Sequence, residues 1–134
     1  GVVLVVRHHQ DPLGLPDVLR RHRIDTVVHL AAIVNPGRDV QGEFRVDVQG
    51  SSHVLAACVE AGVRRLVVSS SGAAYGYHPD NPEWIVETDP LRGNDEFPYS
   101  RHKRMVEEML AAARSTQPGT AGPSATVTRG AAAR

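Results

Sequence analysis

The chain has 134 residues and a mass of 14.5 kDa, the size of a single domain. Hydrophobic residues make up 41% and charged residues 22%, which is typical of a globular protein rather than a disordered one. The 15 basic residues balance the 15 acidic ones, which argues against a nucleic-acid or anionic-membrane binder, because such proteins depend on excess Lys and Arg. No apolar run approaches the roughly 20 residues that cross a bilayer. A single cysteine and no visible secretory signal favour a cytoplasmic protein.

Four short apolar runs predict the β-strands. Residues 2–6 form a continuous run rich in β-branched side chains, a pattern that indicates a strand buried on both faces. Residues 26–30 are predicted as a second buried strand, and residues 66–70 as a third strand. Residues 125–128 are expected to begin a fourth strand that is incomplete in this sequence. The first run starts directly after Gly1, without an initiator Met, which is typical of a sequence that begins inside a domain.

Three helices are predicted between these runs. A short helix covers residues 17–22, and a longer one covers about 39–61, where apolar residues recur at helical spacing until Gly62 ends it. A third helix opens at Pro98, because proline is tolerated in a first turn, and continues to about residue 114. Strands that alternate with helices predict an α/β fold, built as a doubly wound parallel sheet of the Rossmann type.

We expect one partial domain over residues 1–134. Residues 1–114 would form its core, and residues 115–134 would form a linker and an incomplete strand. Residues 72–97 are rich in Gly and Pro and predict a long irregular loop.

The strongest local signal is the sequence Tyr99-Ser100-Arg101-His102-Lys103. Residues four apart share a helix face, so the Lys103 ammonium is expected beside the Tyr99 phenol. The cation and the positive end of the helix dipole both favour the phenolate, which makes Tyr99 a candidate general acid/base. Lys103 is also the only lysine among the 15 basic residues. The alternative is a solvated helix face, because a tyrosine and a lysine at this spacing are common.

The serines Ser69, Ser70 and Ser71 stand where the third predicted strand ends. Ligands of doubly wound sheets bind at the carboxyl ends of strands. A hydroxyl there can hydrogen-bond a substrate oxygen while Tyr99 moves its proton, although a turn is an alternative explanation for a serine cluster. The loop over residues 72–97, between Ser71 and Tyr99, is long enough to border an active site.

Four motifs follow one another along the chain: His29-Leu30-Ala31-Ala32, Asp47-Val48-Gln49-Gly50-Ser51, Ser69-Ser70-Ser71-Gly72-Ala73-Ala74-Tyr75-Gly76 and Tyr99-x-x-x-Lys103. In this order and spacing they resemble the extended short-chain dehydrogenase/reductases, which include the NAD-dependent sugar-nucleotide epimerases and dehydratases. The resemblance covers roughly residues 1–115.

The resemblance implies a role for each candidate site residue. Tyr99 would be the catalytic acid/base, Lys103 would hold the ribose hydroxyls of a nicotinamide cofactor, and Ser71 would anchor the substrate hydroxyl or carbonyl. The residues that would line the cofactor are apolar and mostly small: Leu30, Ala31 and Ala32. The implied cofactor is NAD, with NADP as the alternative, and the implied partner is a small-molecule substrate.

Several positions depart from the family pattern. The glycine-rich turn that receives the cofactor pyrophosphate is absent from this sequence, and Arg7-His8 stands where Gly-Asp is usual. Asp47 places a carboxylate where the family has an amide. In the strand order 3-2-1-4-5-6, residues 2–6 would be the third strand and residues 26–30 the fourth. We therefore expect an incomplete fold that lacks the first strand-turn-helix, the second strand and the C-terminal substrate region, and that exposes an apolar edge on the fourth strand.

The predicted function is a segment of an NAD(P)-dependent epimerase/dehydratase-type oxidoreductase that acts on a hydroxyl-bearing, sugar-nucleotide-like substrate by Tyr-assisted hydride transfer. The alternative is a non-catalytic remnant or sensor domain of the same fold, favoured by the missing turn and opposed by Tyr99, Lys103 and Ser71. The long helix and the Tyr-bearing helix often pack against a second subunit in the family, so a homodimer of the full-length parent and an intramolecular core are both open. No metal site is predicted, because His8 and His9 would point to opposite faces of a strand.

Four further expectations concern individual side chains. Cys58 is expected to be a small core residue of the long helix. His29 is expected to pack beneath the site, and His102 is expected to point to solvent. The aromatic residues of the long loop either touch a sugar ring or pack the loop: Tyr75, Tyr77 and Trp84.

Overall fold

The computed structural model of the chain describes residues 14–33, 37–115 and 124–130. The strand predicted over residues 2–6 and most of the linker that precedes the last strand lie outside the described residues. The other predicted elements all fall within the described ranges and can be compared with the structure.

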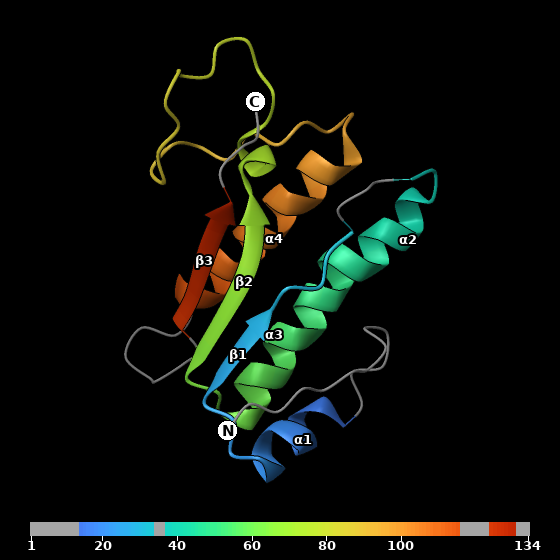
Figure 1. The fold of residues 1–134 in the computed structure, drawn as a ribbon, viewed down its shortest axis with the longest axis vertical. Helices are drawn as coiled ribbons and strands as arrows, with labels where there is room; N and C mark the ends of the chain where they lie inside the picture. The colour runs from blue at the N-terminus through green and yellow to red at the C-terminus, as the bar shows by residue number, and fades with distance from the viewer. Residues whose placement is uncertain (1–13, 34–36, 116–123, 131–134) are drawn as a thin grey trace.

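Three parallel strands form one sheet in the order β1-β2-β3 (Figure 1). They are β1 (Thr26–His29), β2 (Arg65–Ser71) and β3 (Ser124–Gly130). The strand β2 is central, since Arg65 is level with Thr26 of β1 on one side and with Ser124 of β3 on the other. This order corresponds to the fourth, fifth and sixth strands of the doubly wound arrangement, so the predicted parallel Rossmann-type sheet is confirmed for the part of it described.

The three predicted helices are present, with bounds that differ by one or two residues. They are α1 (Leu15–Arg21), the long helix, and α4 (Pro98–Ser115). The long helix is continuous but has three parts: α2 (Val40–Phe44), the π-helical turn η1 (Arg45–Gln49) and α3 (Gly50–Ala61). It ends as predicted at Gly62, which adopts a left-handed φ of 72° that costs glycine little. None of the described helices is both long and apolar enough to cross a membrane.

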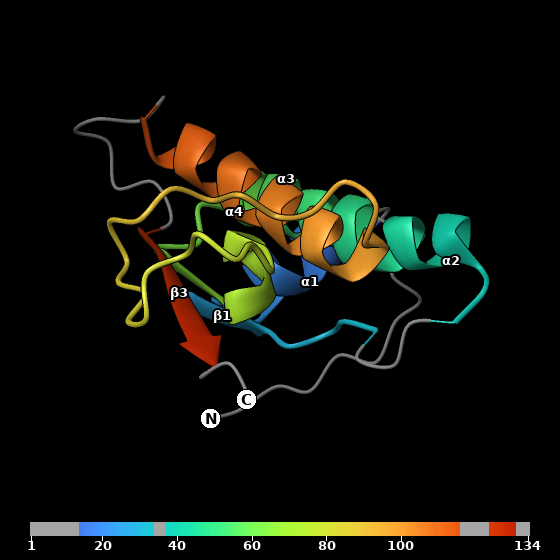
Figure 2. The same ribbon diagram turned by 90° about the horizontal axis from the view of Figure 1, so that it is seen from above.

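The core lies between the sheet and a layer formed by α3 and α4, which run side by side on one face of the sheet (Figure 2). Leu66 and Val68 of β2 pack there in one buried cluster with Leu110 of α4 and Cys58 of α3. Cys58 is a fully buried core residue, and burial raises the pKa of its thiol to about 11. The thiol therefore stays protonated and inert in the folded chain.

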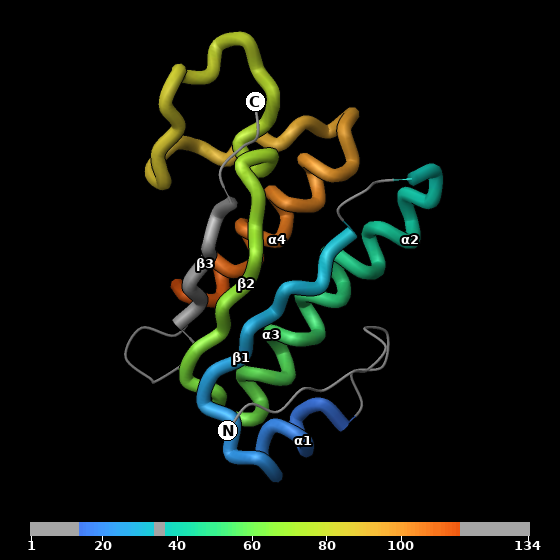
Figure 3. Tube along the Cα trace, viewed as in Figure 1, coloured from blue at the N-terminus to red at the C-terminus, as the bar shows by residue number. Residues whose placement is uncertain are grey.

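The strand β1 is covered on one face only, in contrast to the burial on both faces that its apolar sequence predicts. It lies at the edge of the described sheet (Figure 3). His29 faces the helices and is 7% exposed, whereas Val28 is 58% exposed and Leu30, just beyond the strand, is 68% exposed. The described helices α3 and α4 lie on the His29 side, and no described element covers Val28. The unpaired edge expected for this strand stays a prediction, because the strand predicted over residues 2–6 lies outside the described residues.

The difference between Leu66 and Val28 gives a test of where the stability of the fold resides. Leu66→Ala is expected to lower the free energy of unfolding by about 2–5 kcal/mol, because it leaves a cavity at a fully buried position. Val28→Thr is expected to change it by less than about 0.5 kcal/mol, because the side chain is already hydrated and stays β-branched. Urea unfolding followed by circular dichroism measures both. Equal losses in the two variants would contradict the core as described.

Candidate functional site

The predicted site residues gather where the carboxyl ends of β1 and β2 meet the start of α4. His29 is level with Val68 and the two strands are parallel, so their carboxyl ends lie at the same end of the sheet. Residues 30–32 follow β1 at this edge, and Ser71 is the last residue of β2. Directly after Ser71, the short 3-10 helix η2 (Gly72–Tyr75) packs against α4. The fold thus brings together segments that are far apart in the sequence.

Tyr99 and Lys103 lie on one face of the first turns of α4. The Lys103 Nζ lies 5.5 Å from the centroid of the Tyr99 ring, in the geometry of a cation–π contact. Lys103 is only 6% exposed, while Tyr99 is half-buried. The ammonium is thus held against the ring by packing, and Tyr99 stays partly exposed.

Ser71 is the last residue of β2, and its side chain also caps the N-terminus of η2. Its Oγ accepts a hydrogen bond from the backbone N–H of Ala73 at 3.2 Å. A hydroxyl that accepts one hydrogen bond still carries a proton that it can donate. The cap therefore orients Ser71 without using up its capacity to bind a substrate oxygen.

Ser100 is a residue that the sequence analysis did not single out, and it fixes the start of α4. Its side chain is fully buried, and its Oγ donates to the carbonyl of Ala73 at 2.6 Å. The same oxygen accepts from the backbone N–H of Asn94 at 2.9 Å. Ser100 therefore joins the turn that carries Tyr99 to the turn that Ser71 caps. Its only sequence signal is a small polar residue beside the tyrosine.

Asn94 and Arg104 hold the end of the long loop against the same helix. Asn94 Oδ1 accepts from the backbone N–H of Tyr77 at 2.7 Å, which closes the loop on itself. Arg104 donates to the carbonyl of Gly93 and pairs with Asp95, both at 2.6 Å. Both ends of the loop are therefore held by hydrogen bonds, and its second end lies against α4, the helix that carries Tyr99.

Asp47 holds the backbone that follows the predicted cofactor strip of residues 30–32. Its side chain is 3% exposed, and its Oδ1 accepts from the backbone N–H of Ile33 at 2.8 Å. One turn further, Ser51 Oγ donates to the Asp47 carbonyl at 2.6 Å and lies 3.2 Å from His29 Nε2. The departure from an amide at position 47 is therefore accommodated, because the contact to Ile33 needs only an acceptor oxygen. His29 is buried beneath this region, as expected.

His102 is fully buried, so the expectation that it points to solvent is wrong. Its ring packs edge-on against Phe44, with ring centroids 5.6 Å apart and an interplanar angle of 66°. The physical reason is that α4 packs against η1 as well as against η2, and its first turns are therefore covered from two sides. Burial, followed by the charge of Arg101, lowers the pKa of the imidazole.

The loop aromatics divide into a buried and an exposed set. Tyr75 is 5% exposed and packs the loop, whereas Trp84 is 75% exposed. The rings of Tyr77 and Phe97 lie 5.6 Å apart, and Phe97 lies 6.3 Å from Tyr99. His8 and His9 lie outside the described residues. Among the residues that the structure describes, no three His, Cys, Asp or Glu side chains are grouped to hold a metal ion.

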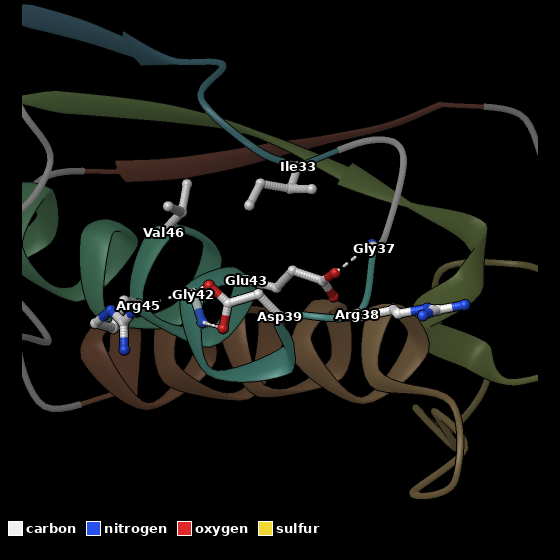
Figure 4. Close-up of a pocket in the computed structure, with 8 residues that line it drawn as sticks. All are labelled: Ile33, Gly37, Arg38, Asp39, Gly42, Glu43, Arg45 and Val46. Atoms are coloured by element: carbon white, nitrogen blue, oxygen red, sulfur yellow. Dashed lines mark hydrogen bonds and ion pairs between the residues drawn. The ribbon is translucent and has the colours of Figure 1, made fainter.

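A pocket of about 440 Å³ opens beside the predicted cofactor strip, at the start of the long helix (Figure 4). Ile33 and Val46 form one wall, and the turn that enters α2 forms the other. Glu43 Oε1 accepts from the backbone N–H of Gly37 at 2.5 Å and so fixes this turn. The pocket is not lined by Tyr99 or Ser71, so it is not the cleft of the candidate catalytic residues.

Comparison with known proteins shows the family to which the chain belongs. The family model described as "NAD dependent epimerase/dehydratase family" matches residues 9–128. The UDP-glucose 4-epimerase of Azospirillum brasilense is 37% identical over 99 residues, which cover 72% of this chain and 27% of that protein. The UDP-glucose 4-epimerase of Yersinia enterocolitica is 33% identical over 97 residues, which cover 69% of this chain and 28% of that protein. The chain spans less than a third of the length of these relatives.

Solved structures of the same kind share the fold. The UDP-Glc/GlcNAc 4-epimerase of Campylobacter jejuni matches with a TM-score of 0.78 and 25% identity, over 92% of this chain and 36% of that chain. The UDP-glucose-4-epimerase of Stenotrophomonas maltophila, solved with bound NAD and formylated UDP-arabinopyranose, matches with a TM-score of 0.76 and 30% identity, over 93% of this chain and 36% of that one. The predicted Rossmann-type fold is confirmed by these matches.

The Ser100 bridge predicts a stability loss that no exposed serine should share. Ser100→Ala is expected to lower the free energy of unfolding by about 1–3 kcal/mol, because it leaves a buried carbonyl and a buried N–H without a partner. Ser52→Ala, at an exposed position of α3, is the matched control and should stay within about 0.5 kcal/mol of the parent. Urea unfolding compares the two. A Ser100→Ala variant as stable as the control would show that the bridge is not formed.

Proposed function

Because the chain belongs to the NAD dependent epimerase/dehydratase family, we propose that it carries the acid/base and nicotinamide side of an NAD-dependent epimerase or dehydratase. The substrate class is a hydroxyl-bearing, sugar-nucleotide-like small molecule, in keeping with relatives named UDP-glucose 4-epimerase. One observation supports the proposal. Lys103 Nζ lies 5.5 Å from the centroid of the Tyr99 ring, on the helix that packs against the turn after Ser71, at the carboxyl end of β2.

The side chains present fit the nicotinamide end of such a cofactor. Lys103 offers an ammonium on the same helix face as the Tyr99 phenol, which is the donor set needed for ribose hydroxyls. Ala31 and Ala32 carry small side chains that allow close approach, and Asp47 fixes the backbone just beyond them through Ile33. The glycine-rich turn for the pyrophosphate is not part of this sequence, so the proposal covers only this side of the cofactor site.

In the proposed reaction, Tyr99 accepts the proton of the substrate hydroxyl as the carbon that bears it loses a hydride. Ser71 donates a hydrogen bond to the same oxygen and holds it while it becomes a carbonyl. When bound, the nicotinamide supplies the hydride acceptor, in a transient or net transfer. Lys103 lies beside the ring that takes the proton, with its Nζ 5.5 Å from the ring centroid.

A non-catalytic sensor domain of the same fold is the second candidate. It is favoured by Arg7-His8, which stands where the family usually has Gly-Asp. A protein of this kind binds the cofactor without turning over a substrate, so binding and turnover measured side by side on the complete protein separate the two functions.

The acid/base assignment predicts the behaviour of two variants of the complete protein. Tyr99→Phe is expected to lower kcat by about 10²–10⁴-fold, because it removes only the hydroxyl that moves the proton. Lys103→Arg is also expected to be impaired, because a planar guanidinium does not replace a compact ammonium at a buried position.

Ser52→Ala is the control, since it removes a hydroxyl from an exposed position of α3, and it should keep turnover near that of the parent. Circular dichroism confirms that each variant is folded. Near-normal turnover in Tyr99→Phe or Lys103→Arg would refute the assignment. NAD binding without turnover in the parent would favour the sensor function.

A further inference from the structure

Two aromatic rings continue from Tyr99 across the two ends of the long loop, which lies beyond the carboxyl end of β2 (Figure 1). The ring centroid of Phe97 lies 6.3 Å from that of Tyr99, and the ring centroid of Tyr77 lies 5.6 Å from that of Phe97. The successive ring planes are tilted by 46° and 49°, so the rings form a bent series rather than a flat stack. Tyr77 and Phe97 are called the aromatic pair below.

The packing of the loop does not account for the aromatic pair. Tyr77 is 63% exposed and Phe97 is 37% exposed, whereas Tyr75, which packs the loop, is 5% exposed. A single exposed aromatic residue is common on a protein surface, but two adjoining rings present a continuous apolar surface to water. The aromatic pair is therefore a candidate contact surface for a ligand with an apolar face.

Asn94 holds the backbone of both members of the aromatic pair. Its side-chain Oδ1 accepts from the Tyr77 N–H at 2.7 Å, and its backbone carbonyl accepts from the Phe97 N–H at 3.3 Å. The Asn94 N–H in turn donates at 2.9 Å to the buried Oγ of Ser100, which follows Tyr99 in the sequence. The aromatic pair and the candidate acid/base are thus fixed through one residue, and such preorganisation lowers the entropy lost when a ligand binds.

A second set of contacts holds the arm of the loop that carries Tyr77. Gly76 precedes Tyr77 with a φ of 79°, and a Cβ at that position would collide with the carbonyl of Arg92. His78 Nε2 donates to the same carbonyl at 2.6 Å, and Asn81 Nδ2 donates to the carbonyl of Gly76 at 2.8 Å. The backbone is therefore held on both sides of Tyr77.

The place of the aromatic pair beside Tyr99 indicates which part of a substrate would meet it. In the proposed reaction the sugar lies at Tyr99, because its hydroxyl gives up the proton there. A sugar ring presents C–H groups on its faces, and the electron-rich face of an aromatic ring attracts such groups.

We propose that Tyr77 and Phe97 form a subsite that packs against the sugar ring of the substrate, and that Asn94 is the positioning residue of this subsite. The inference rests on the proposed function, since it is the reacting hydroxyl that places the sugar. Tyr77 and Phe97 thereby determine specificity for the sugar and take no part in the proton transfer.

Ligand binding by the complete protein tests the proposal in a Tyr99→Phe background, which keeps the ring and removes the hydroxyl that moves the proton. Calorimetric titration with UDP-glucose and with UDP, at saturating NAD, separates the contribution of the sugar from that of the nucleotide. Tyr77→Ala is expected to weaken UDP-glucose binding by about 2- to 10-fold and to leave the affinity for UDP unchanged. Tyr77→Phe keeps the ring and should bind both ligands as the Tyr99→Phe protein does.

Three further variants in the same background separate the subsite from a general effect on the loop. Phe97→Leu keeps an apolar side chain without the ring and should show the same selective loss of UDP-glucose affinity. Asn94→Ala removes the acceptor of the Tyr77 N–H and should reproduce the loss in Tyr77→Ala. Trp84→Ala, which removes a 75% exposed ring of the same loop, is the control and should keep both affinities. Circular dichroism confirms that each variant is folded.

An unchanged UDP-glucose affinity in Tyr77→Ala and Phe97→Leu would overturn the proposal, as would an equal loss in Trp84→Ala. A parallel loss of UDP affinity would show that the aromatic pair contacts the nucleotide instead, and the absence of UDP-glucose binding in the Tyr99→Phe protein would also refute the subsite. Turnover that persists in Tyr99→Phe contradicts the proposed function and leaves the subsite standing, because the subsite is measured by binding alone.

Discussion

The candidate site depends on one buried hydroxyl, that of Ser100. It joins the carbonyl of Ala73 to the N–H of Asn94 and so ties the start of α4 to the end of β2 and to the end of the long loop. Tyr99 precedes Ser100 in the sequence, and Ser71 caps the turn that contains Ala73. The relative position of the candidate acid/base and the candidate substrate anchor is therefore set by hydrogen bonds that are shielded from water, where such bonds are strongest.

The other half of the site is fixed by the long helix rather than by the sheet. The π-helical turn η1 carries Asp47 to the backbone of Ile33, and Ser51 extends the contact to His29. Turns of this kind are often found at functional sites, because the additional residue in the turn redirects side chains. Here the Asp47 carboxylate of η1 holds Ile33, which follows the predicted cofactor strip at the carboxyl end of β1. The helix α4 carries the other candidate residues, Tyr99 and Lys103.

Much of the fold could be predicted because its signals are local. The runs of Val and Leu identified the strands β1 and β2, the short segment of residues 125–128 indicated β3, and Gly62 and Pro98 marked helix ends to within two residues. The spacing of Tyr99 and Lys103 also correctly indicated one shared helix face. These features depend on neighbours in the sequence, which a single chain displays directly.

The remaining features arise from contacts between segments distant in the sequence. Ser100 resembles any small polar residue until η2 packs against it, and His102 follows the spacing of a solvated position until η1 covers it. Val28 has the sequence of a doubly buried strand, but its exposure depends on which elements flank it. Periodicity reports which residues can be buried, whereas the partner that buries them is a property of the topology.

The bond between Asn94 Oδ1 and the Tyr77 N–H has a consequence for how such a site can diversify. It closes residues 77–94 into a loop whose two ends are held together, and most of that loop is exposed. The entropy of closing such a loop grows only slowly with its length. The span can therefore be lengthened, shortened or exchanged at small cost, while the hydrogen bonds of Ser100 that hold the start of α4 stay intact.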